Sequence, residues 1–149
     1  MKNEMTVIFD ALSENEAFAR NTVAAFCVAL DPTVDQINDI KTAVSEAVTN
    51  CIVHAYTTKS DNNKVKITTT ISDSTVHIVV SDTGIGIADI KSAMQPFYTT
   101  KPDEERSGMG FTVMESFMDS LVVEPNEPSG TVVSMKKTIR GADWKEKKH

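Results

Sequence analysis

The chain has 149 residues, of which 40% are hydrophobic and 24% charged, as expected for one soluble globular domain. It carries 15 Lys and Arg against 21 Asp and Glu, and the resulting net charge of −6 argues against a nucleic-acid binder, which needs a cationic surface. No apolar run is long enough to cross a bilayer, and the first residues lack the apolar stretch of a signal peptide. We therefore expect a cytoplasmic chain that binds a protein or a small molecule.

The first part of the chain predicts a strand over residues 4–10 and a helix from about 14 to 30. Ser13 and Glu16 have the spacing of a capping box, in which each would bond the other's backbone N–H. Arg20 lies off the apolar stripe of this helix, and on spacing alone it is a solvated surface arginine. The stripe predicted to be buried consists of Phe18, Thr22, Phe26 and Ala29.

A second and longer helix is predicted from a capping box at Thr33 and Gln36 to about residue 56. Its apolar side consists of Ile37, Ile40, Val44, Val48, Cys51 and Ala55. The two cysteines of the chain, Cys27 and Cys51, fall in helical apolar patterns and are interpreted as buried small hydrophobes in a reducing compartment.

Glu46 and Asn50 stack four residues apart on the opposite side of the same helix. Glutamate is usually an exposed helix residue, but asparagine is a poor helix former, and Ala43, Ala47 and Val53 indicate that this side is covered too. A carboxylate and an amide on a covered face can hold a metal ion and activate a hydroxyl or a water.

A hairpin follows, with alternating apolar residues in two strands over 65–71 and 75–80. Residues 81–87 then read SDTGIGI, which places Asp82 at the end of a strand with Gly84 and Gly86 behind it. The glycines allow a sharp turn and leave room for a flat ligand, while the carboxylate can accept a hydrogen bond from it. Taken alone, the pattern also fits an ordinary Asp-initiated turn.

The second half of the chain predicts a short helix over about 89–94 and a loop over 96–106 without periodicity. The loop ends in Gly108 and Gly110, where a helix begins, and a helix N-terminus with exposed backbone N–H groups suits a phosphate. Two strands close the domain, over 121–124 and 130–135.

Four sequence boxes occur in one order: Glu46 with Asn50, Asp82 with the two glycines, the Gly108 loop, and Gly130 with Thr131. This order resembles the nucleotide-binding boxes of the ATPase superfamily that contains gyrase, the ninety-kilodalton heat-shock chaperone, histidine kinases and mismatch-repair ATPases. The resemblance implies an α/β (α+β) two-layer sandwich with a mixed, mostly antiparallel sheet and helices on one face. It also implies that ATP and Mg²⁺ bind between the long helix, the glycine turn and a lid.

The resemblance assigns a role to each box. Asn50 would ligate Mg²⁺ and Glu46 would act as the general base. Asp82 would accept from the adenine amino group, and Gly84 and Gly86 would allow the base to approach closely.

The later boxes would hold the phosphates and support the adenine side of the site. Gly108 and Gly110 would offer backbone N–H groups to the phosphates, and Thr131 would support the hydrogen bonds to adenine. Four further residues at the lid would contact the nucleotide by the same resemblance: Thr99, Lys101, Arg106 and Ser107.

A narrower resemblance, to the sporulation anti-sigma F factors of endospore-forming bacteria, is carried by residues 3–5, 13–20, 44–50, 97–102 and 105–111. These factors are serine protein kinases, and the resemblance implies a homodimer that sequesters a sigma factor and phosphorylates an anti-anti-sigma protein. An arginine matching Arg20 would lie on the partner-docking surface. The kinase domain would cover residues 1–138, and 139–149 would form a polar, disordered tail.

Two other functions fit the same boxes. One is a nucleotide-gated module that sequesters a sigma factor without phosphoryl transfer, which Glu46 disfavours because a pure binder needs no base. The other is the stress-response relative of these kinases, disfavoured by the match over residues 5–20. A histidine kinase would need a histidine-bearing dimerisation segment, and the roughly 35 residues before the long helix contain no histidine.

Overall fold

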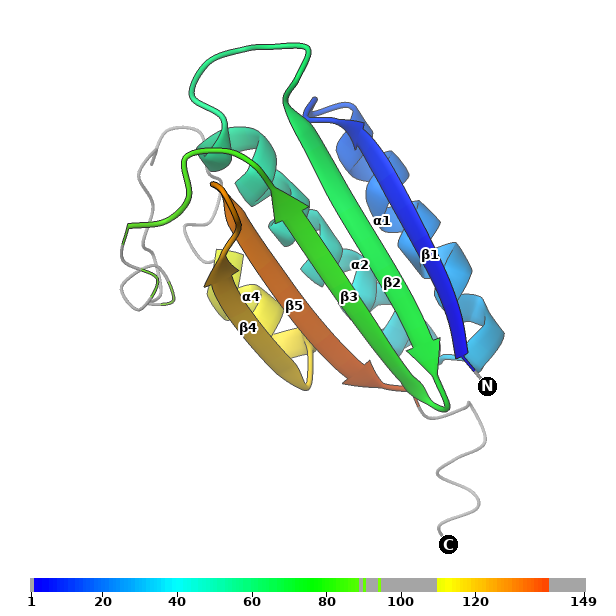
Figure 1. Ribbon diagram of the computed structural model, residues 1–149. Helices are drawn as coiled ribbons and strands as arrows, with labels where there is room; N and C mark the ends of the chain where they lie inside the picture. Colours follow the sequence, from blue (N-terminus) through cyan, green and yellow to red (C-terminus); the bar gives the residue numbers. More distant parts are fainter. Residues whose placement is uncertain (1, 89, 91–93, 95–109, 140–149) are drawn as a thin grey trace, which may run out of the picture.

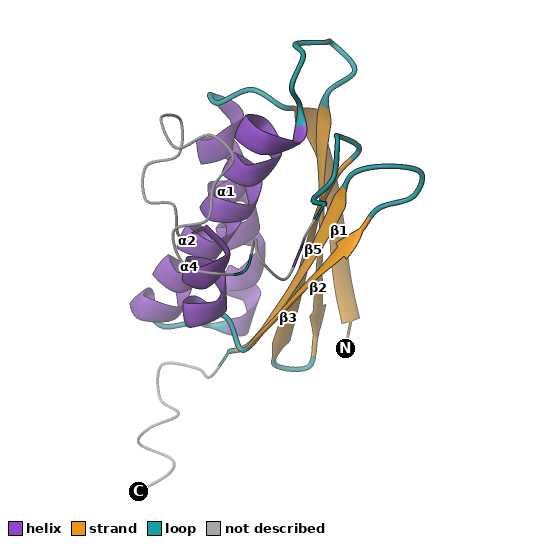
Figure 2. Cartoon of the chain, turned by 90° about the vertical axis from the view of Figure 1, so that its left-hand side faces the viewer, coloured by secondary structure: helices purple, strands orange, loops and turns teal. Residues whose placement is uncertain are grey.

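The computed structural model describes residues 2–88, 90, 94 and 110–139. A sheet forms one layer and the helices form a second layer on one of its faces (Figures 1 and 2). The elements follow in this order: β1 (Lys2–Asp10), α1 (Asn15–Cys27), a 3₁₀ turn (Val28–Leu30), α2 (Val34–Asn50), a π-helical turn (Cys51–Ala55), β2 (Lys64–Ser72), β3 (Thr75–Asp82), α4 (Gly110–Phe117), β4 (Ser120–Pro125) and β5 (Thr131–Thr138). The two-layer sandwich predicted from the sequence is confirmed.

The described strands form a five-stranded sheet in the order β1-β2-β3-β5-β4. All four pairings are antiparallel, so the described sheet contains no parallel pair where a mixed sheet was expected. The β2–β3 hairpin is confirmed, with Asp73 at its turn in a left-handed conformation (φ 55°). Alternate residues of the hairpin face the helices, and these are buried: Val65, Ile67, Ile71, Val76, Ile78 and Val80.

Helix α2 lies between α1 and α4 and packs against both. Its capping box is confirmed, because the Thr33 hydroxyl accepts from the Gln36 N–H at 3.1 Å and the Gln36 side chain accepts from the Thr33 N–H at 2.9 Å. Its apolar side is buried as predicted, apart from the half-buried Ile37. The helix also continues as predicted to residue 55, although its last five residues widen into the π-helical turn.

The first helix begins at Asn15, close to the predicted start, but the capping box predicted for Ser13 and Glu16 is wrong. Glu14, at the N-cap position, has helical backbone angles, and no side chain caps the helix. Glu16 pairs instead with Arg20 one turn later, so its carboxylate does not reach back to cap. Asn15 fastens the helix to the preceding strand, because its side-chain amide donates to the Asp10 carbonyl at 2.9 Å.

The predicted buried face of α1 is also wrong, by about one residue around the helix. Phe18 is 51% exposed and Ala29 is exposed, whereas the buried residues are Ala19, Val23, Ala24 and Cys27. These side chains are small, and they let α1 approach the alanine-bearing face of α2 closely. The larger Phe18 lies at the margin of the core, in an edge-to-face contact with Phe9 of β1.

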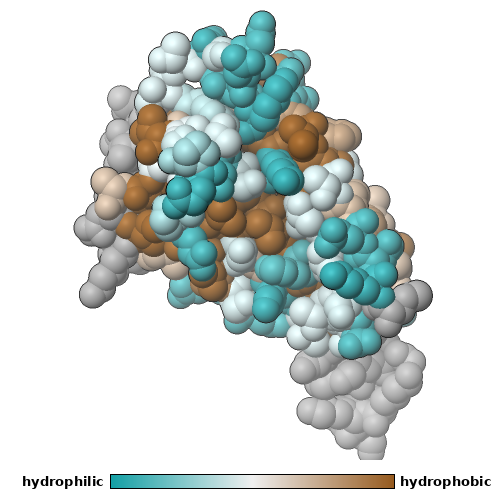
Figure 3. All heavy atoms as spheres, viewed as in Figure 1, coloured by the Kyte–Doolittle hydropathy of each residue, from teal (hydrophilic) through white to brown (hydrophobic). Residues whose placement is uncertain are grey.

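The other face of the sheet carries no helix among the described residues. Figure 3 views this side and shows hydrophobic side chains scattered among hydrophilic ones. One row across the sheet reads Thr6, Thr68, Val79, Ser134 and Val122. Within the described part of the chain, no helix is long and apolar enough to cross a membrane.

The folded domain extends one residue beyond its predicted end. Ile139 is 3% exposed and packs in the core, and its N–H donates to the Ser74 carbonyl at 2.7 Å. The rest of the predicted tail, 140–149, lies outside the described residues, as does most of the short helix predicted over 89–94.

Candidate functional site

Asp82 ends β3 and is the buried acid at one end of the sheet. Its side chain is 5% exposed, and its Oδ1 accepts from the backbone N–H groups of Gly84 at 3.0 Å and Thr131 at 3.2 Å. Burial raises the pKa of the Asp82 carboxyl, while hydrogen bonds from Gly84, Cys51 and Thr131 oppose that rise. The carboxylate therefore meets only donors from the protein in these contacts, as a ligand-recognising acceptor requires.

The glycines beside Asp82 lie against backbone with no room for a side chain. A Cβ on Gly84 would lie 2.1 Å from the Ala55 carbonyl oxygen, and one on Gly130 would lie 2.1 Å from the Asp82 carbonyl oxygen. Gly86 has a positive φ of 77°, which L-residues rarely adopt. The turn after β3 is thus pressed against the end of α2 on one side and the start of β5 on the other.

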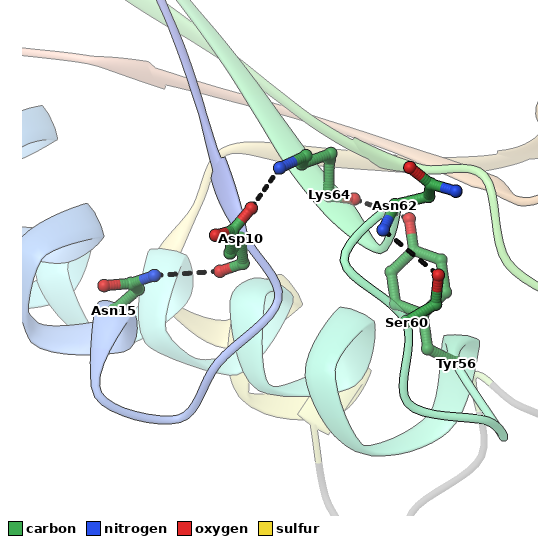
Figure 4. A network of polar contacts seen from close by, with 6 residues as sticks. All are labelled: Asp10, Asn15, Tyr56, Ser60, Asn62 and Lys64. Carbon is green, nitrogen blue, oxygen red and sulfur yellow. Dashed lines mark hydrogen bonds and ion pairs between the residues drawn. The ribbon is translucent and has the colours of Figure 1, made fainter.

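Tyr56 fixes the same turn from the end of the long helix. Its hydroxyl donates to the Lys64 carbonyl at 2.5 Å and accepts from the Thr83 N–H at 3.0 Å. Figure 4 shows Tyr56 beside the start of β2, where the Lys64 ammonium pairs with Asp10 at the end of β1. One phenol therefore links the glycine turn to the start of β2.

Glu46 and Asn50 lie on the last turns of α2, and both are half-buried. The expectation that this side of the helix is covered is confirmed by Ala43 and Ala47, which are fully buried. Asn50 directly precedes the π-helical turn, whose last residue, Ala55, contacts the glycine turn through the Ile85 N–H at 2.8 Å. Carboxylate and amide oxygens of this kind are the ligands that Mg²⁺ prefers.

Two of the remaining predicted residues are among those described. Thr131 is 7% exposed and contacts Asp82 through its backbone, and Gly110 is buried as the first residue of α4. The other predicted nucleotide contacts lie outside the described residues: Thr99, Lys101, Arg106, Ser107 and Gly108. Arg20 lies on α1, where its half-buried guanidinium pairs with Glu16.

Sequence reasoning missed four residues that shape the site. A hydrogen bond from Cys51 lowers the pKa of Asp82. Ala55 and Tyr56 hold the glycine turn, and the Asn126 side-chain amide donates to the Asp82 carbonyl at 2.8 Å. Asn126 stands in a turn rich in Pro and Gly, which is a local signal for a structural asparagine. The other three carry no local signal, because their partners are distant in sequence.

Comparison with known proteins identifies the architecture. Residues 9–137 match the family described as the histidine kinase-like ATPase domain. The anti-sigma F factor of Geobacillus sp. (strain WCH70) is 55% identical over 139 residues, which cover 93% of this chain and 94% of that protein. The anti-sigma F factor of Clostridium botulinum (strain Eklund 17B / Type B) is 57% identical over 136 residues, covering 91% and 94%.

The chain belongs to the anti-sigma F factor family. That family lies within the histidine kinase-like ATPases, so the fold is an ATP-binding one of the kinase and ATPase type. The boxes recognised in the sequence and the two-layer fold thus agree with the family match.

Solved structures agree on the fold. The RsbU and RsbW domains of Rv1364c from Mycobacterium tuberculosis superpose with a TM-score of 0.67 at 16% identity, covering 92% of this chain and 32% of that longer one. The catalytic domain of the histidine kinase ThkA superposes with a TM-score of 0.58 at 18% identity, covering 91% and 98%. At these identities the likeness concerns the fold alone.

Proposed function

We propose that the chain is an anti-sigma factor that binds and inhibits a sporulation sigma factor, sigma F, and inactivates its anti-anti-sigma factor by ATP-dependent phosphorylation of a serine. The observation that carries the nucleotide part is the buried Asp82 carboxylate, which accepts from two backbone N–H groups and is flanked by glycines without space for a Cβ. A free acceptor on such a carboxylate suits the amino group of adenine, and the bare glycine backbone suits a flat ring.

The phosphate side of the proposal rests on the end of α2 and the start of α4. Asn50 would hold Mg²⁺ through its amide oxygen, and Gly110 would offer a backbone N–H at a helix N-terminus. No group of three or more His, Cys, Asp or Glu among the described residues is arranged for a metal ion. A nucleotide-bound Mg²⁺ fits that donor set, since it uses one or two protein oxygens together with phosphates and waters.

Glu46 is the residue proposed to act as general base. It lies one helical turn before Asn50 on the same face of α2, so both side chains would meet the same end of the nucleotide. Bound ATP would supply the phosphoryl group and leave as ADP, and the Glu46 carboxylate would accept the proton from the attacking serine hydroxyl. The lid residues Lys101 and Arg106 remain proposed phosphate contacts.

The protein partners are proposed from the relatives, which are named anti-sigma F factors. Arg20 on α1 is the proposed docking residue, and its half-exposed side chain can exchange Glu16 for a partner's acid. An inhibitor of a sigma factor acts where transcription takes place, so this function implies a cytoplasmic chain.

We also propose a homodimer through the outer edge of β1, with which no described strand pairs. This strand is the outer one of the sheet, and two antiparallel copies paired about Thr6 would bring Lys2 of one chain opposite Asp10 of the other. Beside the edge lies an open hollow of about 550 Å³ lined by Met5, Phe18, Asn21, Thr22, Ala25 and Phe26. A second copy would cover the exposed ring of Phe18.

The test is the intact mass of the candidate anti-anti-sigma protein after incubation with Mg-ATP and this chain. The wild type is expected to add one phosphate, and Glu46→Gln to add none while still binding ADP, because the amide keeps the volume but cannot accept the proton. Glu124→Gln, at an exposed acid of β4, is the matched control and is expected to transfer normally.

Each outcome separates the candidate functions. Phosphate transfer by Glu46→Gln at the wild-type rate would remove Glu46 from the role of base. ATP binding by the wild type with no added mass on the partner would favour the nucleotide-gated sequestering module instead. Absence of nucleotide binding would refute the proposal at its first step.

A further inference from the structure

The loop between β4 and β5, residues 126–130, holds the main chain at the start of the glycine turn. The Asn126 side-chain amide donates to the Asp82 carbonyl at 2.8 Å, and the Ser129 hydroxyl donates to the Thr83 carbonyl at 3.0 Å. Directly after the loop, the Thr131 N–H donates to the Asp82 carboxylate at 3.2 Å. This part of the chain therefore contacts Asp82 at its main-chain carbonyl and at its side chain.

The Asn126 contact lies where the pairing of β3 with β5 ends. The last paired residues of these two strands are Ser81 and Val132, so Asp82 is one residue beyond the pairing. Its carbonyl faces the loop, because a Cβ on Gly130 would lie 2.1 Å from the carbonyl oxygen. Asn126 thus supplies a side-chain donor to this oxygen at a place where main-chain pairing with β5 has stopped.

Two further hydrogen bonds fix the Asn126 residue itself. Its Oδ1 accepts from the Glu127 N–H at 2.9 Å, and its backbone N–H donates to the Gly130 carbonyl at 3.0 Å, which closes the loop. The amide must therefore direct its NH₂ group at the Asp82 carbonyl, because the reverse orientation would set donor against donor and acceptor against acceptor. The side chain is held at both ends and forms a fixed link between the loop and Asp82.

This link bears on the direction of the Asp82 carboxylate. The Gly84 N–H, which also bonds the carboxylate, belongs to the same turn and moves with Asp82. Asn126 and Thr131 hold Asp82 from a different part of the chain, so they fix it relative to the sheet. An acceptor that is already in place when the ligand arrives contributes more to affinity than one that must first be ordered.

We propose that Asn126 is a positioning residue of the proposed base site, whose amide fixes the main chain of Asp82 and thereby directs the carboxylate at the amino group of adenine. The inference rests on the proposed nucleotide site and deepens it. Asn126 acts through Asp82 and need not touch the nucleotide.

The test compares Asn126→Ala and Asn126→Asp with wild type, using calorimetric affinities for ADP and for purine riboside 5′-diphosphate, which is ADP without the amino group. Asp keeps the size of the side chain and the acceptor for the Glu127 N–H, so it removes the donor alone should Ala disturb the loop. Asn15→Ala is the matched control. Asn15 is also half-buried, and its amide makes the same kind of contact, with the Asp10 carbonyl at 2.9 Å, at the end of β1.

Loss of the Asn126 donor is expected to lower the affinity for ADP by roughly three- to tenfold, the range for one net hydrogen bond. The affinity for purine riboside diphosphate should change much less, because this ligand has no amino group for Asp82. The added charge of Asn126→Asp acts on the diphosphate that both ligands share, so the ratio of the two affinities is the quantity to compare. Asn15→Ala should keep the wild-type ratio although it removes a comparable hydrogen bond.

Three outcomes would overturn the inference. Equal weakening of both ligands by the two Asn126 variants would mean that the amide supports the fold without directing the carboxylate. Unchanged affinities would mean that Asp82 is held in place without Asn126. The same selective loss in Asn15→Ala would mean that any loosening of the domain produces it. A wild type that binds neither ligand, or binds both equally, would instead refute the proposed base site, and this inference with it.

Discussion

Replacement of Gly84 by alanine tests the close backbone contact on which the site is built. The added Cβ would start 2.1 Å from the Ala55 carbonyl oxygen, and real Cβ atoms essentially never come closer than 3.0 Å to such an atom. The turn and the end of α2 must therefore separate by about 0.9 Å, which strains the Ile85–Ala55 hydrogen bond. Overpacking costs about 1–3 kcal/mol and the weakened bond about 1 kcal/mol, so we expect a loss of about 2–4 kcal/mol.

Urea unfolding of the full chain measures this loss, and the ADP affinity measured alongside should fall, because the separation opens the proposed base site. Gly86→Ala is the comparison within the same turn. Its Cβ would lie 3.2 Å from the Gly130 carbonyl oxygen, so its cost comes mainly from the positive φ, about 1 kcal/mol. A Gly84→Ala chain as stable as Gly86→Ala, with unchanged ADP affinity, would refute the close-contact argument.

Two further predictions concern single polar groups. The Asp82→Asn chain should lose ADP binding. It should also gain stability relative to wild type as the pH rises from about 3.8, because burial raises the pKa of the wild-type carboxyl, so that its ionisation opposes folding above that pH. Urea titrations between pH 4 and 8 measure the difference in unfolding free energy, and a difference that does not change with pH would contradict the prediction. Thr33→Ala should cost about 1 kcal/mol by loss of the capping box of α2, whereas Ser13→Ala, at the position that does not cap, should change the unfolding free energy by less than about 0.5 kcal/mol.

The elements that the sequence predicted well are those with a strong period and a matching cap. The hairpin alternates over both strands, and α2 has a capping box and an apolar side that is buried almost throughout. In these segments local preference and tertiary packing agree, so one pattern is enough to predict structure.

The first helix failed for an identifiable reason. Its aromatic residues suggested the buried stripe, but close packing of two helices is decided by the smallest side chains, here Ala19 and Ala24. Its capping pattern failed because Arg20 engages Glu16 from within the helix. Both outcomes depend on which of several possible partners each side chain contacts in the folded chain, and the pattern within one segment does not contain that information.

The sequence motifs of the candidate site could be recognised from the sequence, but the residues that hold those motifs in place could not. Asp82, Gly84 and Gly130 stand where their spacing indicated, at a backbone that leaves no space for side chains. The residues that hold them, Ala55 and Tyr56, contact partners about 30 residues away in sequence, so spacing alone does not identify them.

Different parts of the candidate site would serve nucleotide binding and phosphoryl transfer. The proposed base site owes its shape to main-chain contacts, because Asp82 accepts from two backbone N–H groups and two glycines lie against backbone carbonyl oxygens. The proposed chemistry, in contrast, depends on the side chain of Glu46 on an adjacent helix. Substitutions at the glycines should therefore weaken binding and stability together, whereas Glu46→Gln should remove transfer and leave both intact. If Glu46→Gln weakened ADP binding or stability as the glycine substitutions do, the shape and the reactivity of the site would not come from different parts of the fold.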